Sequence, residues 1–445
     1  MTQKFRAAKL SFLPLIMTIF VCVSGGPYGL EKVMGSGAGM GLLLILLTPL
    51  VWALPVALMS AELGSAFPEE GGYYIWVKRG LGPMAGFFCA WLTYLYYWVD
   101  LAIYPVMFIG YFKNFPFASF LNNPMYAFGC SLVMIVPLTW LNIRGVKTVG
   151  NTSVIITLML IIPFIIMVLW GSGSILSHPF SPFYPMVPQG VDTHQAFFSG
   201  LYIVMWNYMG WDSLSTISGE VDKPKKNFPR ALFIALIMVM AIYFLPAWIG
   251  ISLQPDTTKW TEGSWPAIAR IIGGTWFGEL IAVCGVASAC GLFISGLLAS
   301  SRVPMVLAED GLLPRFFTKH HPRYGTPWVA ILVSACIYTG MSLVSFEQLA
   351  EFDVLLYSMA LVLELVALLV LRIKQPELNR PFRIGGGWIM LLLVVLLPLS
   401  LIVLVFSHSL HENSHWPIYI VVIALFSGLA VWFFRAKTIN SQVKK

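Results

Sequence analysis

Three acidic residues lie inside long apolar stretches of the sequence, where a charged side chain is costly. They are Asp100, Asp212 and Glu364. An Asp at the centre of a membrane-spanning helix costs about 2.5 to 3.5 kcal/mol on translocon scales, so its presence indicates a functional site. Such carboxylates could bind a cation or exchange a proton. Asp100 and Glu364 could instead make a structural hydrogen bond to a neighbouring helix, and Asp212 could instead cap a helix N-terminus.

Aromatic residues accompany the acidic ones and could hold an ammonium group. Trp206, Tyr208 and Trp211 precede Asp212, and Tyr28 lies in an apolar stretch near the N-terminus. A desolvated cation–π contact contributes about 2 kcal/mol or more. Because aromatic residues make up 14% of the chain, packing against lipid or protein is the alternative for each of them.

Glycine, proline and polar residues interrupt two of the apolar stretches near their middle. The first interruption runs from Ser24 to Gly29 and includes Gly25, Gly26 and Pro27, and the second is residues 206–212. Either could be an ordinary kink, since Gly and Pro are frequent in membrane helices. Discontinuous helices at matching positions of two repeats instead point to the binding site of a transporter. Gly25 and Gly26 would then belong to that site.

The composition predicts an integral membrane protein. Of the 445 residues, 58% are hydrophobic and 11% are charged, whereas soluble domains carry about 25% charged residues. A membrane-spanning helix needs about 20 apolar residues, and twelve such stretches follow one another. They cover residues 11–34, 39–66, 82–112, 124–142, 150–170, 194–219, 229–252, 276–301, 327–346, 350–371, 387–407 and 416–434.

The basic residues predict the orientation of the chain. Cytoplasmic loops of membrane proteins retain Lys and Arg. With a cytoplasmic N-terminus, only Lys113, Lys259 and Arg270 of the 27 Lys and Arg fall in outside loops, and Lys32 falls within the first stretch. We therefore expect both terminal segments, 1–10 and 435–445, to be cytoplasmic, in a plasma (inner) membrane. The net charge of +7 is spread between apolar stretches and forms no patch for nucleic acid.

The positions of the two interruptions predict an all-α architecture with an internal repeat. They fall in the first and sixth stretches, so residues 11–170 and 194–371 would each hold five helices. Because five is odd, the second repeat would enter the membrane from the opposite face. Residues 387–434 would add two further helices. The six cysteines show neither CxxC nor metal-like spacing, so we expect no metal and no cofactor.

Several motifs resemble one transporter family. Gly25-Gly26-Pro27-Tyr28-Gly29, Glu62-Leu63-Gly64-Ser65 with Gly71-Gly72-Tyr73, and Glu220-Val221 with Lys223-Pro224 are similar to those of the amino acid/polyamine/organocation superfamily. The chain resembles most closely its polyamine:proton symporter branch. The resemblance implies a leucine-transporter-like fold of two inverted five-helix repeats plus two helices.

The resemblance also implies a function. We expect proton-coupled uptake of a polyamine or related cationic amine by alternating access, with Asp100 or Glu364 exchanging the proton. Amino-acid carriers of the superfamily receive the substrate carboxylate on N–H groups of the first interruption, where Pro27 lacks one. An amino-acid permease, or an amino-acid/amine antiporter, is the alternative. Glu62, Glu220 and Glu309 border basic loops and are candidates for inner-gate ion pairs, with plain loop structure as the alternative. Glu31 is a further gate candidate, which could form an ion pair with Lys32 or simply pack.

Two other classes of protein fit the sequence less well. A membrane enzyme would need a constellation such as HExxH or GxSxG, and the sequence contains neither. A channel would normally have pore-lining rings from an oligomer, whereas two interrupted helices in one chain favour a single central site. The expected partners are therefore a small cationic substrate, protons and membrane lipid.

Overall fold

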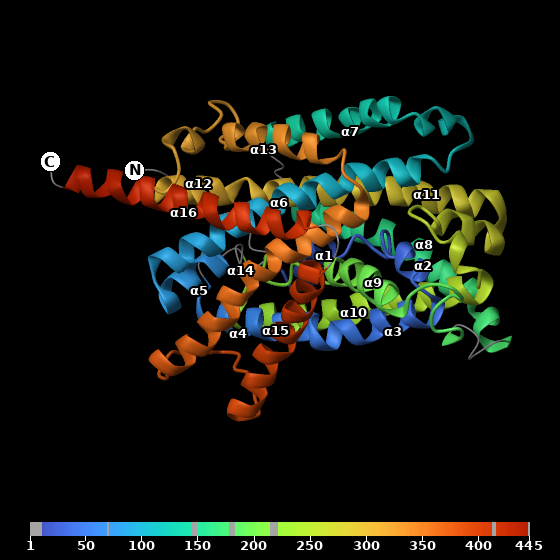
Figure 1. Cartoon of the computed structure of the whole chain (residues 1–445), viewed down its shortest axis with the longest axis horizontal. Coiled ribbons are helices and arrows are strands. Elements are labelled where there is room, and N and C mark those ends of the chain that lie inside the picture. Colours follow the sequence, from blue (N-terminus) through green and yellow to red (C-terminus); the bar gives the residue numbers. More distant parts are fainter. Residues whose placement is uncertain are drawn as a thin grey trace.

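The computed structural model describes residues 11–68, 71–144, 149–177, 183–213, 221–411 and 415–443. Every regular element in these ranges is a helix. The predicted N-terminal segment 1–10, the last two residues of the predicted C-terminal segment and the gate candidate Glu220 lie outside them. Figure 1 shows the arrangement of the helices.

The helices follow the predicted apolar stretches. The α-helices are α1 (Phe12–Val23), α2 (Glu31–Gly35), α3 (Ala38–Val51), α4 (Ala53–Ala66), α5 (Gly72–Leu81), α6 (Pro83–Phe112), α7 (Pro124–Arg144), α8 (Val149–Ser177), α9 (Thr193–Asn207), α10 (Pro224–Leu253), α11 (Trp265–Ser300), α12 (Arg302–Glu309), α13 (Trp328–Met341), α14 (Phe346–Lys374), α15 (Gly387–His411) and α16 (Trp416–Val443). Short 3-10 helices are η1 (Pro116–Asn122), η4 (Thr257–Lys259) and η5 (Arg315–Thr318). Within the described residues, nine helical segments are long and apolar enough to cross a membrane, and Phe12–Val23 and Trp328–Met341 are shorter apolar helices.

Several helix boundaries differ from those predicted, among them the following three. The second stretch is divided at Trp52, which has φ −112° and ψ −69°. The helix predicted to begin at residue 276 begins at Trp265 and bends at Gly274, whose φ of 73° is outside the helical range. The tenth helix begins at Phe346 because the hydroxyl of Ser345 caps it, accepting a hydrogen bond from the backbone N–H of Gln348.

Helices α6 and α14 form the centre of the molecule. In their most apolar windows, 72% and 67% of the residues are buried, against 22% for the apolar part of α16. Helix α14 packs along α6 and α5, and α6 also packs against α11. Helices α7 and α13 lie together at one edge, and α15 packs against α4 near the opposite edge (Figure 1). Side chains on the facing surfaces of α6 and α14 are therefore enclosed by protein.

Both predicted interruptions are present in the backbone. Between α1 and α2 the chain is irregular, and Gly26 and Gly29 have φ of 83° and 90°. Helix α9 ends at Asn207, and Gly210 has φ of 88°. These left-handed values favour glycine, and Pro27 cannot donate a helical hydrogen bond. The residues after Ser213, up to 220, lie outside the described part of the chain.

Candidate functional site

Asp100 lies on α6 between two other helices. Both of its carboxylate oxygens accept a hydrogen bond from the Tyr104 hydroxyl at 2.8 Å, and one accepts from the Trp206 indole N–H at 3.3 Å. Trp206 belongs to the last turn of α9, directly before the second interruption. A Cβ added to Gly296 of α11 would lie 3.8 Å from Asp100. Asp100 therefore faces α9 and α11 and stays partly exposed.

A fourth acidic residue, Asp353 on α14, was missed by the sequence reasoning. It is fully buried, and within the described part of the chain neither carboxylate oxygen has a hydrogen-bond partner. Asp353 and Asp100 interact electrostatically. The sequence did contain a signal for Asp353, because it lies in an apolar stretch and precedes Glu364 by eleven residues. Eleven residues make about three helical turns, so both side chains lie on the same helix face to within about 20°. The position of Asp353 near the predicted start of the tenth helix hid that relation.

Asp212 and Glu364 form a second group. Asp212, 2% exposed, accepts a hydrogen bond from the Tyr357 hydroxyl at 2.6 Å. Glu364 is buried on α14 and interacts electrostatically with Asp212. The Cys89 thiol of α6 lies 3.8 Å from one Glu364 oxygen, and the other oxygen has no hydrogen-bond partner among the described residues. Asp212 therefore contacts α14 through Tyr357, and its sequence-based alternative role, as a helix N-cap, stays a prediction.

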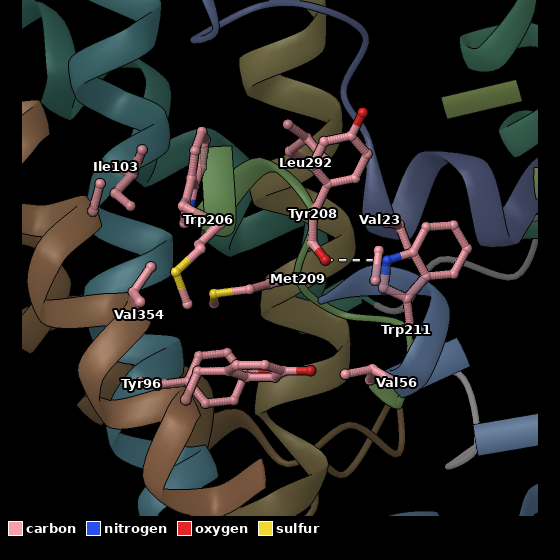
Figure 2. Packing of buried hydrophobic residues seen from close by; sticks show 14 of the residues in the cluster. Val23, Val56, Tyr96, Ile103, Trp206, Tyr208, Met209, Trp211, Leu292 and Val354 are labelled. Atoms are coloured by element: carbon pink, nitrogen blue, oxygen red, sulfur yellow. Dashed lines mark hydrogen bonds between the residues drawn. The ribbon is translucent and has the colours of Figure 1, made fainter. Parts of the chain in front are cut away.

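Aromatic side chains lie between the two groups of acidic residues. Tyr96 and Tyr97 of α6 stack with ring centroids 4.5 Å apart, and Tyr357 meets Tyr96 edge to face at 5.5 Å. The Tyr97 hydroxyl donates to Ser213 at 3.4 Å. Figure 2 shows Tyr96 below Met209 and Trp206 at the second interruption. Ring faces and carboxylates thus share one region of the protein interior.

The charge of this region is not balanced by basic side chains. Across the residues that the structure describes, none of the ion pairs formed by Lys, Arg or His includes Asp100, Asp212, Asp353 or Glu364. An isolated buried carboxylate is strongly disfavoured. These four carboxyl groups therefore lack a basic counter-charge within the described part of the chain.

The four aromatic residues predicted from the sequence separate into two groups. Trp206 reaches Asp100, and its ring meets Phe346 edge to face at 5.4 Å. Tyr208 donates to the Ile45 carbonyl at 3.1 Å, and the Trp211 indole donates to the Tyr208 carbonyl at 3.1 Å (Figure 2). Tyr28 donates to the Ile281 carbonyl at 3.2 Å. The last three are 0 to 1% exposed and pack the interruptions, whereas Trp206 lies at the acidic residues.

Helix α11 satisfies the carbonyls of the first interruption. The Ser288 hydroxyl donates to the Gly25 carbonyl at 2.6 Å, and the Trp265 indole donates to the Pro27 carbonyl at 2.7 Å. A Cβ on Gly25 would lie 2.3 Å from Leu292. The Gly26 N–H donates to the Ser24 hydroxyl at 3.2 Å. Gly25 is therefore needed for close packing, and Gly26 already has a partner.

Glu31 places its own carboxylate at the first interruption. It is fully buried and accepts hydrogen bonds from the Gly29 N–H at 2.8 Å, the Tyr111 hydroxyl at 2.5 Å and the Gly263 N–H at 2.9 Å. Gly263 belongs to the loop between α10 and α11. The next residue, Lys32, forms an ion pair with Glu347 at the start of α14. Glu31 therefore joins the interruption, α6 and this loop, and a gating role stays a prediction.

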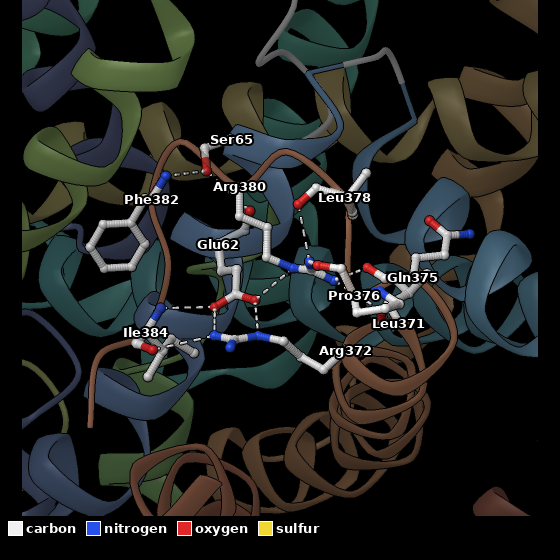
Figure 3. Close-up of polar contacts among 10 residues, drawn as sticks. All are labelled: Glu62, Ser65, Leu371, Arg372, Gln375, Pro376, Leu378, Arg380, Phe382 and Ile384. Atoms are coloured by element: carbon white, nitrogen blue, oxygen red, sulfur yellow. Dashed lines mark hydrogen bonds and ion pairs between the residues drawn. The ribbon is translucent and has the colours of Figure 1, made fainter. Parts of the chain in front are cut away.

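Glu62 forms a buried ion-pair network that joins α4 to the last turn of α14 and to the segment after it (Figure 3). Both of its oxygens accept hydrogen bonds from Arg372 at 2.5 Å. The Arg380 Nε lies 3.2 Å from the carboxylate, and the Ile384 N–H donates to it at 2.9 Å. The sequence predicted an ion pair for Glu62 without its partners, and its action as a gate stays a prediction.

At the end of α12 the contacts belong to Asp310 and not to the predicted Glu309. Asp310 forms an ion pair with Lys78 of α5 at 2.8 Å and accepts a hydrogen bond from Tyr74, whereas Glu309 is exposed. Burial alone would raise the pKa of Asp310, but these hydrogen bonds outweigh it and lower the pKa below its usual value. The same hydrogen bond raises the pKa of Lys78.

The chain is similar over most of its length to known transport proteins. A family model described as amino acid permease matches residues 10–426. The polyamine transporter RMV1 of Arabidopsis thaliana is 36% identical over 397 residues, covering 88% of this chain and 79% of the relative. The polyamine transporter PUT1 of Oryza sativa subsp. japonica is 35% identical over 407 residues, covering 91% and 74%. The branched-chain amino acid permease BcaP of Bacillus subtilis is 26% identical, covering 92% and 89%.

A chain matched over nearly its whole length, with long apolar helices and two interrupted ones, is a membrane transport protein. It belongs to the amino acid permease family. The resemblance found in the sequence is thereby confirmed. The protein is a multi-pass membrane transporter of a small organic substrate, and its relatives are named transporters and permeases.

Proposed function

We propose that this transporter is a secondary carrier that takes up polyamines or related cationic amines by alternating access. One observation carries the proposal: Asp100, Asp353, Asp212 and Glu364 lie in the protein interior with no basic side chain paired to them among the described residues. An ammonium group would neutralise carboxylates and contact aromatic faces, such as that of Trp206, at the same time. The polyamine transporters among the relatives support the same substrate class.

Proton coupling follows from the same carboxylates. A buried carboxylate that no ammonium group of the substrate neutralises must carry a proton across with it or remain an uncompensated charge. Asp100 is partly exposed and Glu364 is buried, so the first could exchange protons with solvent more readily. We propose both as coupling residues. Uptake of amine would then depend on an imposed pH gradient.

The first interruption is poorly suited to an amino-acid carboxylate. Pro27 has no N–H, the Gly29 N–H already donates to Glu31, and the Gly26 N–H donates to Ser24. A substrate carboxylate would have to displace the carboxyl group of Glu31 from the Gly29 N–H. Gly25, Gly26 and Tyr28 are therefore proposed to shape the site, while the acidic residues and Trp206 bind the substrate. Tyr208, Trp211 and their hydrogen bonds would hold the second interruption in place.

The proposed topology has twelve spans, with residues 11–170 and 194–371 as inverted repeats and 387–434 outside them. Both termini would be cytoplasmic in the plasma (inner) membrane. Helices α5 and α12, which carry Lys78 and Arg302, lie on the same side of the molecule as the end of α16 (Figure 1). The positive-inside tendency supports a cytoplasmic location for that side.

Uptake into proteoliposomes tests the function. Labelled putrescine, spermidine and a panel of amino acids are offered with and without an inward proton gradient. We expect accumulation of the amines, increased by the gradient, and no accumulation of neutral amino acids. Accumulation of amino acids alone would make the chain an amino-acid permease instead, and amine uptake indifferent to the gradient would remove proton coupling.

A further inference from the structure

The four acidic residues are arranged in two pairs along two facing helices. Cys89 of α6 contacts Glu364 of α14, and eleven residues further along α6 Asp100 interacts with Asp353, eleven residues earlier on α14. The two helices are therefore antiparallel in this region, with each pair at the same level. Eleven residues of helix advance by about 16 Å and return to the same face. Asp100 with Asp353, and Asp212 with Glu364, are accordingly two separate acidic pairs.

Each acidic pair contains a buried carboxylate oxygen to which no described residue donates a hydrogen bond. In the described part of the chain, both oxygens of Asp353 and one oxygen of Glu364 are buried without a hydrogen-bond partner. Leaving such an acceptor unpaired costs free energy, more so when it is charged. The interval between the pairs is lined by Tyr96, Tyr97 and Tyr357. Rings of this kind suit methylene groups and ammonium groups alike.

We infer that the two acidic pairs are separate ammonium subsites that receive the two ends of one linear oligoamine. The inference rests on the proposed function and adds Asp353 as a residue that determines specificity. The Asp100 and Asp353 pair would bind one terminal ammonium group. The Asp212 and Glu364 pair would bind the other, with the carbon chain crossing the tyrosine rings between them.

The spacing predicts which amines fit. The Asp212 carboxylate is held by Tyr357, which lies on α14 between Asp353 and Glu364, so the gap between subsites is shorter than the separation of the helix positions. A zigzag chain of single bonds of about 1.5 Å advances by about 1.25 Å per bond. A diamine with four bonds between its nitrogens then spans about 5 Å, and a triamine with nine bonds spans about 11 Å. Only the longer molecules would engage both pairs.

The test is a length series of α,ω-diamines, with the monoamine of each chain length as its partner. Their inhibition of labelled spermidine uptake is measured for the wild-type protein and for Asp353→Asn. For the wild type we expect affinity to rise with chain length until both pairs are reached, by about tenfold or more over the matched monoamine. In Asp353→Asn the long diamines should fall to within about twofold of their monoamines, since one charged partner is lost.

Matched controls separate the possible failures. Glu351→Gln lies on the same helix and contacts Ser409, away from both pairs, and should leave the length series unchanged. If wild-type protein takes up amines without any length dependence, or if Asp353→Asn keeps the wild-type series, the two-subsite inference is wrong while the proposed function stands. If no amine is taken up at all, the proposed function itself fails. Should Asp353→Asn not fold, the wild-type series and Asp353→Glu, which keeps the charge, still decide.

Discussion

At the scale of single residues, removing the charge of Asp100 tests whether this residue belongs to the substrate site. Asp100→Asn keeps the size of the side chain and can still contact Tyr104 and Trp206, but it cannot neutralise an ammonium group. We expect amine uptake to fall at least tenfold while the protein remains folded in the membrane. Near-normal uptake, measured at equal amounts of purified protein in proteoliposomes, would exclude Asp100 from the site.

Gly25 tests how closely the first interruption packs on α11. In Gly25→Ala the new Cβ would lie 2.3 Å from a Leu292 carbon and 2.6 Å from the Ser288 hydroxyl. Overpacking of this kind costs about 1 to 3 kcal/mol. We expect a lower melting temperature and weaker uptake. Gly129→Ala on α7, where a Cβ meets nothing within 4 Å, is the control, and equal melting temperatures for both variants would contradict the close packing.

Glu262 gives a pH dependence in the loop between α10 and α11. Burial raises its pKa to about 8. The folded protein then binds this proton more tightly than the unfolded chain, so stability should fall as pH rises from about 4.5 to about 8. Glu262→Gln should flatten the melting temperature across this window. The exposed Glu377→Gln should leave the slope as in wild type, and a slope unaffected by Glu262→Gln would exclude that residue as its source.

Residue identity alone predicted part of the site. Asp100, Asp212 and Glu364 could be found because a carboxylate is conspicuous in an apolar stretch. Asp353 was missed because its relation to Asp100 depends on the register of two antiparallel helices, which is a tertiary property. Tyr208 and Trp211 could not be told apart from Trp206, since all three flank the same interruption and only their directions differ (Figure 2).

At the scale of elements, the Glu62 network is the contact whose loss should destabilise the fold most. Glu62→Ala would leave Arg372 and Arg380 facing each other without their shared carboxylate. Breaking a buried ion pair from one side costs about 3 to 5 kcal/mol. We expect a strongly reduced melting temperature and low yield. Joint replacement of Glu62, Arg372 and Arg380 by apolar residues should recover part of the lost melting temperature. An unchanged melting temperature in Glu62→Ala would contradict a stabilising role for the network.

The contact between α5 and the end of α12 should matter far less and should depend on acidity. The pKa of Asp310 is lowered from 3.8, so the ion pair with Lys78 is intact at neutral pH and is lost as pH falls below about 4. A half-exposed pair of this kind contributes about 0 to 1 kcal/mol. Asp310→Asn should therefore reduce the melting temperature slightly at pH 7, and this reduction should shrink as the pH falls below about 4. A larger decrease in melting temperature at the lower pH would contradict the expected direction of this pH dependence.

The two interruptions were predictable, whereas the ends of several helices were not. Glycine and proline act through the local backbone, so Gly26, Gly29 and Gly210 mark the irregular turns in the sequence itself. The bend at Gly274 and the division at Trp52 carry no comparable local signal in an apolar run. The partners of Glu62 come from residues about 310 positions later in the chain, beyond the reach of any local pattern.

At the scale of the whole molecule, the orientation can be measured directly. In a background without the six native cysteines, Lys259→Cys reports on the loop between α10 and α11, and Lys319→Cys reports on the segment after η5. A membrane-impermeant maleimide should label the first in intact cells and the second only after permeabilisation. The reverse pattern would invert the proposed topology.

The carboxyl group of Glu31 joins the first interruption, helix α6 and the loop between α10 and α11. Its hydrogen-bond partners in these three parts are Gly29, Tyr111 and Gly263. These three parts cannot separate one at a time without leaving a hydrogen-bonding group empty in a dry environment. Displacing the loop would therefore also disturb the turn that the same carboxyl group holds. The single side chain of Glu31 thus couples the position of the loop between α10 and α11 to that of the first interruption.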